Sequence, residues 1–250
     1  MAQGSSIEWT EATWNPVAGC TPVSPGCLNC YAARMALRLE KMSCGGFGKY
    51  EGTATKARDG RPVFSGRINL DPGALRLPYR WKLGRLVFVN SMSDLFHEGV
   101  PDDFIHQVFD VMNDCKRHTF QVLTKRPQRA ALMASSLHWG NNIWMGASVE
   151  NAMYRHRVDV LRAVPAKVRF LSCEPLLGSL RNLNLDSIHW VIIGGESGPG
   201  ARPMSSEWVD EIKSQCLESS VAFFFKQWGG VNKTAAGRQL HGRTWDELPN

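Results

Sequence analysis

The sequence lacks long apolar runs and the short motifs that mark many common enzyme classes. No stretch approaches the ~20 apolar residues that span a bilayer, so we expect no membrane segment. The first residues, MAQGSSIEW, carry neither the basic nor the apolar region of a secretion signal, and we expect a cytoplasmic protein. A phosphate-binding glycine loop, a Ser-His-Asp motif and an H-E-x-x-H motif are also missing. An ordinary hydrolase or isomerase barrel is therefore the least favoured interpretation.

Cysteine is present in an odd number, seven, and its distribution along the chain is uneven. Without an export signal, this pattern favours reduced thiols and metal ligation over a disulfide framework. Cys20, Cys27 and Cys30 lie in one Pro- and Gly-rich stretch, with six residues between the first pair and two between the second. Proline and glycine at this density exclude a regular helix or strand and predict a tight loop.

Three soft ligands without an obvious fourth suit an iron–sulfur cluster in which one iron stays open. A zinc site completed by Cys44 or a histidine is the first alternative, and buried cysteines that bind nothing are the second. The spacing alone does not decide among these three possibilities.

The net charge of +6 comes entirely from residues 43–85. This segment holds nine Lys or Arg residues and three acidic ones, whereas the rest of the chain holds twenty of each. Phe47, Tyr50, Phe64, Tyr79 and Trp81 are interleaved with these cations, as on surfaces that bind nucleic acid or another polyanion. A solvated, charged insertion is the simpler alternative.

Short apolar segments alternate with helical patterns along most of the chain, which predicts a parallel α/β sheet. The expected strands are one near 14–19 and six at 86–90, 119–123, 143–146, 168–171, 190–193 and 221–225. Helices are expected at 30–42, 101–116, 127–138, 151–164 and 206–219. We therefore expect residues 1–250 to form one domain, a partial (β/α) barrel of about six to seven mostly parallel strands, with a basic insertion at 43–85. A doubly wound sheet is the alternative.

Polar side chains follow each expected strand, where the strands of a parallel barrel meet at one mouth and build its active site. Singly, residues such as Asp94 or Ser148 would be interpreted as helix caps. Together they predict a polar pocket beside the three cysteines. The candidates are Asn90, Ser93, Asp94, Lys125, Ser148, Glu150, Cys173, Glu174, Gly194, Gly195, Glu196 and Lys226.

These motifs together resemble the phage-associated three-cysteine-motif proteins, which are regarded as relatives of the radical S-adenosylmethionine (SAM) enzymes. The resemblance rests on C-x6-C-x2-C-Y at 20–31, VNSMSDLFH at 89–97, LTKRP at 123–127, GASVEN at 146–151, SCEP at 172–175 and GGESG at 194–198. It covers most of the chain, from Ile7 to about Pro249. The first two cysteines are separated by six residues, where the usual radical-SAM pattern has three.

The resemblance implies a radical-SAM-like barrel with a [4Fe-4S] cluster bound by Cys20, Cys27 and Cys30, and SAM as the second cofactor. Such an enzyme cleaves SAM reductively to a 5′-deoxyadenosyl radical, with the chemistry carried by the cofactor. The resemblance names no substrate. It also implies a reductant protein, and family members are often encoded beside a three-Cys-motif partner protein.

In this interpretation Tyr31 packs near the adenine, Asn90, Ser93 and Asp94 bind the methionyl end, and Ser148 and Glu150 reach the ribose. Cys173 would serve as hydrogen donor and Glu174 as proton shuttle, although a small buried hydrophobic role for Cys173 is the alternative. Lys125 and Lys226 would hold an anionic substrate, or pair with Glu174 or Glu196 as structural charges. Gly194-Gly195-Glu196 follows a late strand, whereas the equivalent SAM-binding element usually follows an early one.

The basic segment 43–85 favours a nucleotide or nucleic acid as substrate. The alternative function is a non-catalytic, zinc-stabilised module that grips nucleic acid through 43–85 and closes its metal site with Cys44. That alternative leaves the polar strand ends unexplained.

Overall fold

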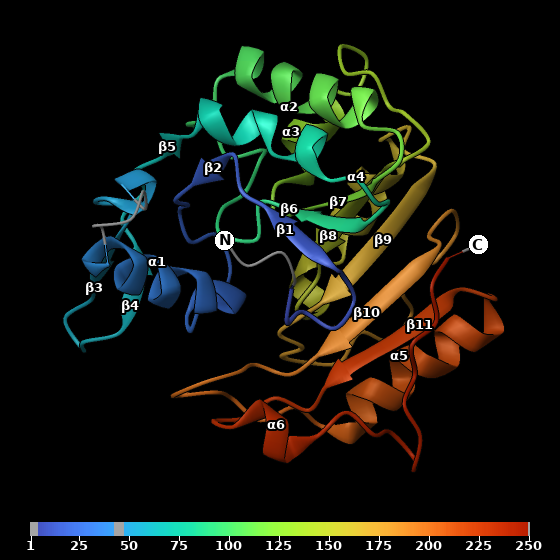
Figure 1. The fold of residues 1–250 in the computed structure, drawn as a ribbon. Helices are drawn as coiled ribbons and strands as arrows, with labels where there is room; N and C mark the ends of the chain where they lie inside the picture. The colour runs from blue at the N-terminus through green and yellow to red at the C-terminus, as the bar shows by residue number, and fades with distance from the viewer. Residues whose placement is uncertain (1–4, 43–47, 250) are drawn as a thin grey trace.

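A seven-stranded parallel sheet, curled into half a barrel, forms the centre of the molecule (Figure 1). The computed structural model describes residues 5–42 and 48–249. The strands stand in the order β1-β6-β7-β8-β9-β10-β11, and each pairs in parallel with its neighbour. Their bounds are Ala12–Trp14 (β1), Leu86–Val89 (β6), Thr119–Thr124 (β7), Ile143–Ser148 (β8), Val168–Cys173 (β9), Trp190–Gly194 (β10) and Ala222–Gln227 (β11). The predicted partial barrel is confirmed.

Helices connect the strands and pack on one face of the sheet (Figure 1). They are α2 (Asp102–Asp114), α3 (Pro127–Leu132), α4 (His156–Arg162) and α5 (Ser206–Glu218). The helix expected at 101–116 is present as α2, whose apolar side chains from Phe104 to Met112 are buried. Two aspartates in its first turn interact favourably with the positive end of the helix dipole. The helices predicted at 127–138 and 151–164 are shorter than expected, because α3 ends at Leu132 and a 3-10 turn, η6 (Ala152–Tyr154), precedes α4.

The two faces of the sheet carry different cores because side chains alternate along a strand. Val87 and Val89 point into the large core beneath the helices, whereas Phe88 between them joins a second cluster on the opposite face. Trp9 packs at the centre of that second cluster, 4.7 Å from Phe88 and 6.2 Å from Trp190 between ring centroids. Trp9 of the N-terminal segment thus packs among aromatic side chains that the strands themselves direct to this face.

The first strand begins earlier than the sequence predicts. The sheet strand β1 ends at Trp14, and Val17–Ala18 (β2) leaves the sheet to pair antiparallel with Asn69–Leu70 (β5). Asn15-Pro16 breaks the ladder because proline has no N–H to donate. The Val17 amide instead donates to the side chain of Asn90, at 3.3 Å. The prediction of one strand near 14–19 is therefore wrong in its position.

The described part of the basic segment, 48–85, is irregular and lies beside α1 (Tyr31–Lys41) (Figure 1). Ala54–Lys56 (β3) and Pro62–Phe64 (β4) form an antiparallel hairpin around Asp59-Gly60, a pair of residues that favours hairpin turns. The segment also contains three short 3-10 helices. The first, η3 (Gly48–Tyr50), precedes the hairpin, and η4 (Pro72–Arg76) and η5 (Pro78–Arg80) follow β5. Residues 43–47, which include Cys44, lie outside the described residues.

The aromatic side chains of this segment pack inward. Tyr50 and Trp81 are buried, and Phe64 packs against the small core beneath α1. Tyr79 is exposed, but its hydroxyl donates to Asp114 at 2.7 Å. Three of the four described rings of the segment therefore stabilise a region with little regular structure of its own, and Phe47 lies outside the described residues.

The C-terminal tail packs back along the last strand. The Phe225 amide donates to the Trp245 carbonyl at 2.9 Å, and the Trp245 ring lies 5.6 Å from that of Phe223. This covers one edge of the sheet, which would otherwise expose unpaired backbone groups. In the described part of the chain, no helix combines the length and apolarity needed to cross a bilayer.

One buried histidine links this fold to pH. His118 is fully buried, its Nε2 donates to the Pro78 carbonyl at 3.1 Å, and burial lowers its pKa below the ordinary value. The imidazole of His118 is therefore protonated near pH 6.5 in the unfolded chain but stays neutral there in the folded chain. The free energy of unfolding consequently falls as the pH drops below about 6.5. We expect His118→Gln to lose less unfolding free energy between pH 7.5 and 5.5 than the native chain in urea titrations. Equal losses would contradict this role.

Candidate functional site

The cysteine loop, residues 19–30, lies at the carboxyl ends of the strands, where it contacts Arg126 after β7, Glu150 after β8 and Glu196 after β10. Gly19 begins it with φ +93, and a Cβ there would lie 2.0 Å from the Arg67 carbonyl oxygen, so only glycine fits. A 3-10 turn, η1 (Pro25–Cys27), follows, and Cys30 is the N-cap of α1. The loop that the Pro and Gly pattern predicts is therefore confirmed.

The three thiols of the loop are half-buried and close enough to influence one another. Burial raises the pKa of Cys20 to about 12 and also raises the pKa of Cys30, and the charge of Cys27 adds to both rises. Without a metal these two cysteines are thiols at neutral pH, so neither is an activated nucleophile. Metal binding would displace their protons, as it does at other cysteine sites.

Cys20 and Cys30 each meet a group that favours the thiolate form, and Cys27 contacts a hydroxyl. Arg126 Nη1 donates to Cys20 Sγ at 3.6 Å, and the Ser24 hydroxyl lies 3.7 Å from Cys27 Sγ. The first-turn amides of Ala32 and Ala33 partly offset the rise in the Cys30 pKa. Such contacts to ligand sulfurs tune metal centres in proteins.

Glu150, at the end of β8, holds the middle of the loop. It is fully buried and accepts hydrogen bonds from Ser24 at 2.5 Å and from Arg157 at 2.9 Å, while Lys125 Nζ lies 3.3 Å away. Burial would lower the pKa of Lys125, but Glu150 and the Cys27 and Cys30 thiols outweigh it and raise that pKa. The Glu150 carboxylate is therefore occupied by Ser24, Arg157 and Lys125, and it is not free to reach a ribose as predicted.

Asp94 and Arg126 hold the start of the loop. Asp94 accepts from the Thr124 hydroxyl at 2.6 Å and from the Lys125 amide at 3.0 Å, and it pairs with Arg126 at 3.4 Å. Arg126 Nη2 in turn donates to the Thr21 carbonyl at 3.0 Å. His97 adds a contact of 2.8 Å between its Nε2 and the Thr21 hydroxyl. Asp94 thus has little capacity left for a ligand.

Glu196, at the end of β10, holds the last part of the loop. Its carboxylate accepts from Asn29 at 2.9 Å and pairs with Arg202 at 2.5 Å. Arg202 also donates to the Pro25 carbonyl at 2.9 Å. Although burial alone would raise the pKa of Glu196, these hydrogen bonds lower it. Glu196 therefore positions the loop, which suits its place after a late strand.

Glu174 and Lys226 form an ion pair of 2.6 Å between the ends of β9 and β11. Both side chains are partly exposed, at 21% and 13%, and the pair makes no contact with the cysteine loop among the described residues. Tyr31 lies near, since the charge of Glu174 contributes to raising the pKa of its hydroxyl, which donates to the Ser91 carbonyl at 2.6 Å. Glu174–Lys226 is thus the charged pair at the mouth that remains available to a ligand.

The remaining predicted residues are divided between the mouth and the core. Asn90 is buried with φ 60, and its Nδ2 has no hydrogen-bond partner in the described part of the chain. Ser93 donates to the Val17 carbonyl at 2.9 Å, and the Ser148 carbonyl accepts from Arg157. Gly195 packs against the Trp228 carbonyl, which lies 2.0 Å from where a Cβ would stand, and Gly194 accepts from the Leu176 amide.

Cys173 does not face the mouth. It is fully buried in the large core, and the charge of Cys216, on α5, contributes to raising its pKa. Strand alternation explains this position, since neighbouring Ser172 and Glu174 take the other face. The hydrogen-donor role predicted for Cys173 would require the opposite orientation.

Sequence reasoning missed the partners that fix the loop: Ser24, Asn29, Arg126, Arg157, Arg202 and His97. Ser24 and Asn29 lie between the cysteines, and Arg126 follows Lys125 directly. The sequence motifs could therefore have indicated these three residues. Arg157 and Arg202 lie inside or beside helices, where a charged side chain usually faces solvent. Only the folded chain brings these two to the loop.

The family comparison bears on nearly the whole chain. Residues 4–249 match the model of a family described as "Protein of unknown function (DUF5131)". The chain belongs to the DUF5131 family. Comparisons with curated proteins and with solved structures found no match.

The three cysteines of the loop are soft ligands of the kind that both iron–sulfur clusters and zinc take. In the described ranges, no three His, Cys, Asp or Glu side chains lie close enough together to hold one metal ion. The sulfurs of a tetrahedral zinc site lie within about 4 Å of one another, since each is ~2.3 Å from the metal. Cys44, the predicted fourth zinc ligand, lies outside the described residues.

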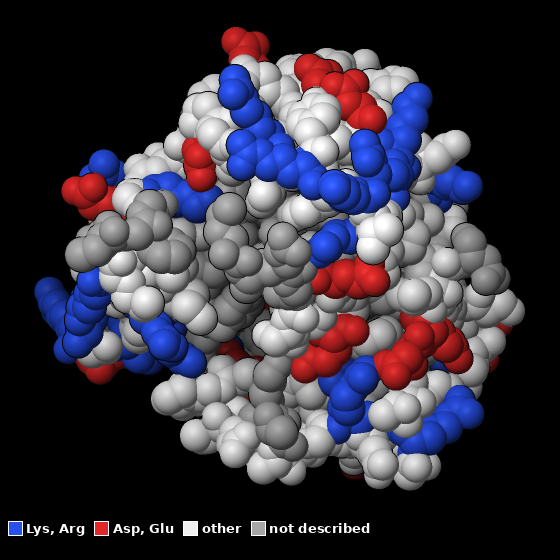
Figure 2. Space-filling model, viewed as in Figure 1, with Lys and Arg blue, Asp and Glu red and all other residues white. Residues whose placement is uncertain are grey.

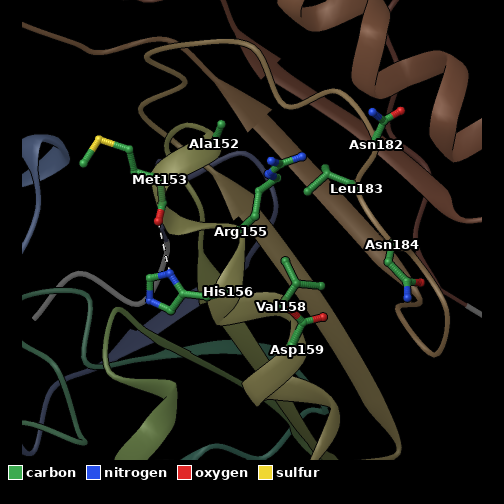
Figure 3. A pocket seen from close by; sticks show the side chains of 9 residues that line it. All are labelled: Ala152, Met153, Arg155, His156, Val158, Asp159, Asn182, Leu183 and Asn184. Carbon is green, nitrogen blue, oxygen red and sulfur yellow. Dashed lines mark hydrogen bonds between the residues drawn. The ribbon is translucent and has the colours of Figure 1, made fainter.

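A separate hollow of about 400 Å³ lies between η6, α4 and residues 182–184 (Figure 3). Figure 3 shows Arg155 directed toward Asn182 and Leu183, and His156 bonded to the Met153 carbonyl at 3.1 Å. The hollow is lined by none of the predicted site residues. It is therefore distinct from the mouth that the cysteine loop covers.

The contact of the loop with Glu150 gives a direct test. A Cβ on Gly26 would lie 2.6 Å from Glu150 Oε1, and Glu150 cannot retreat because Lys125 and Arg157 hold it. We expect Gly26→Ala to reduce the free energy of unfolding by about 1–3 kcal/mol in urea titrations and to expose the thiols to a colorimetric reagent. Gly48→Ala is the matched control, since a Cβ there meets nothing within 4 Å. Equal behaviour of the two variants would contradict the packing of the loop on Glu150.

Proposed function

We propose that this protein is an iron–sulfur enzyme of the radical SAM type, in which Cys20, Cys27 and Cys30 hold a [4Fe-4S] cluster. The observation that carries the proposal is the position of the three thiols. They lie on a loop fixed over the carboxyl ends of a parallel half-barrel, where such folds build their active sites. Cys20 and Cys30 also meet a donor or an amide that favours the charged form of the sulfur.

The chemistry that such a cluster supplies when bound is one-electron cleavage of SAM to a 5′-deoxyadenosyl radical. The protein's own part is to hold and shield the reacting groups. Asp94, Glu150 and Glu196 fix the loop, so they position the ligands and do not bind SAM themselves. The Nδ2 group of Asn90, which has no hydrogen-bond partner among the described residues, and the hydroxyl of Tyr31 are then the better candidates for cofactor contacts.

Glu174 and Lys226 are the groups that we assign to the substrate. Their ion pair is partly exposed at the mouth, and a ligand that replaces it must satisfy both charges, because an uncompensated charge in a half-buried site is costly. Lys125 is bound to Glu150 and serves the loop. The substrate is a nucleotide or nucleic acid in this proposal, on the basis of the charge of segment 43–85.

Four further parts of the proposal rest on the sequence resemblance and on the cofactor. A reductant protein must supply electrons, and a three-Cys-motif partner protein is expected beside this chain. The protein would act in the cytoplasm and be phage-associated. Each of these is a prediction that depends on the cluster being present.

Substitution of one ligand tests the cluster. We expect Cys27→Ala, after anaerobic reconstitution with iron and sulfide, to lose bound iron and the electron paramagnetic resonance signal of the reduced protein. Cys173→Ala is the control, and we expect it to retain both because Cys173 lies in the core. A native protein that holds one zinc ion and ignores SAM would contradict the proposal and favour the zinc-stabilised alternative. Formation of 5′-deoxyadenosine from SAM would support it.

Arg126 offers a second test. Its charged hydrogen bond to Cys20 favours the reduced, more negative state of a cluster. We expect Arg126→Met to lower the reduction potential of the reconstituted protein and to weaken iron retention about 10–100-fold, as loss of outer-shell partners commonly does. The potential is measured by redox titration and the retention by chelator competition. An unchanged potential in a variant that keeps its iron would show that Arg126 only fixes the loop.

A further inference from the structure

A groove of about 290 Å³ lies against the cysteine loop, on the side of the β3–β4 hairpin. Leu28 and Asn29, the two residues between Cys27 and Cys30, form one wall, and Pro199, after β10, forms another. Arg34 on α1 and the turn Asp59–Pro62 complete the lining. The groove thus joins the basic segment to the metal-binding loop.

Arg34 is the unusual member of this lining. It is half-buried, and within the described part of the chain no hydrogen bond or ion pair joins its guanidinium to another residue. Its guanidinium packs against Gly198, where a Cβ would lie 2.2 Å from Nη1. Gly198, with φ +97, therefore leaves room for the guanidinium. A half-buried arginine without a counter-charge, inside a groove, is ready to bind an anion.

The opposite wall is already fixed. Arg61 pairs with Asp59 at 2.5 Å and donates to the Leu28 carbonyl at 3.3 Å, so the hairpin turn is bound to the cysteine loop. Leu28, Pro62 and Pro199 give the groove apolar walls beside the guanidinium of Arg34. A ligand that suits this lining has an anionic group and a flat, partly apolar body.

The surroundings favour a phosphate over an isolated carboxylate. Lys56 and Arg58 on the hairpin are exposed, and Figure 2 shows Lys and Arg side chains gathered over the hairpin at the left of the view. A cluster of positive charges attracts polyanions through long-range electrostatics, beyond the reach of a single hydrogen bond. This favours a ligand with phosphate groups.

We propose that this groove binds a nucleoside phosphate, free or within a single strand, with Arg34 holding the phosphate. The inference deepens the proposed function, on which it rests for the identity of the substrate. The binding itself does not require a cluster. It places the phosphate beside the residues between Cys27 and Cys30, and leaves Glu174 and Lys226 to contact the group that reacts.

Binding titrations with two kinds of probe test this site. Fluorescently labelled 12-nucleotide single strands of DNA and RNA are compared with a labelled nucleoside monophosphate, on the full-length protein before and after reconstitution. We expect Arg34→Met to weaken binding about tenfold, the loss of one charge-assisted contact, and to reduce the salt dependence by about one phosphate contact. Binding of the monophosphate would indicate a free nucleotide as ligand, and binding of the strands alone would indicate a strand.

Arg38→Met is the matched control, because Arg38 lies one turn further along α1 and does not line the groove. We expect it to change affinity less than twofold, and both variants to keep the native melting temperature. Equal affinity of the Arg34→Met and Arg38→Met variants, or no binding of any probe by the native protein, would overturn the proposal. If the protein binds a probe through Arg34 but never takes up iron, the proposed binding site is supported and the proposed iron–sulfur enzyme is contradicted.

Discussion

The arrangement of the site depends on the buried carboxylate of Glu150. It has no access to water, so its charge is balanced only by the protein, through Arg157, Lys125 and the Ser24 hydroxyl. A buried charge of this kind is costly unless every partner stays in place. The end of β8, the helix after it and the centre of the cysteine loop are therefore held in one geometry, and Asp94 and Glu196 repeat the arrangement at the two ends of the loop.

The general architecture could be read from the sequence because its patterns are local. Apolar strands alternate with helical stripes, and the six later strands of the sheet lie where the periodicity places them. The first strand was displaced by Asn15-Pro16, whose effect depends on Asn90, which lies far along the chain but accepts the amide of Val17. The lengths of α3 and α4 were also set by packing, which periodicity alone does not measure.

The site was predictable in its position and less so in the roles of its residues. Polar residues at strand ends correctly indicated the mouth, but the sequence does not distinguish a carboxylate that binds a ligand from one that binds an arginine. Asp94, Glu150 and Glu196 are of the second kind, and their partners Arg126, Arg157 and Arg202 are brought to them only by the folded chain. Cys173 and Glu174 are adjacent in the chain, yet the alternation of side chains along a strand places the two on opposite faces.

The attachment of the loop to a late strand has a consequence for how the protein matures. Asn29 and Glu196 are 167 residues apart in the chain, and Arg202 reaches Pro25 across 177 residues. Contacts between such distant residues form late, after the intervening chain has ordered. During synthesis, the cysteines emerge from the ribosome long before the residues that hold their loop. The loop thus reaches its final shape only when most of the sheet exists, so a metal centre built there would be inserted into a nearly complete protein.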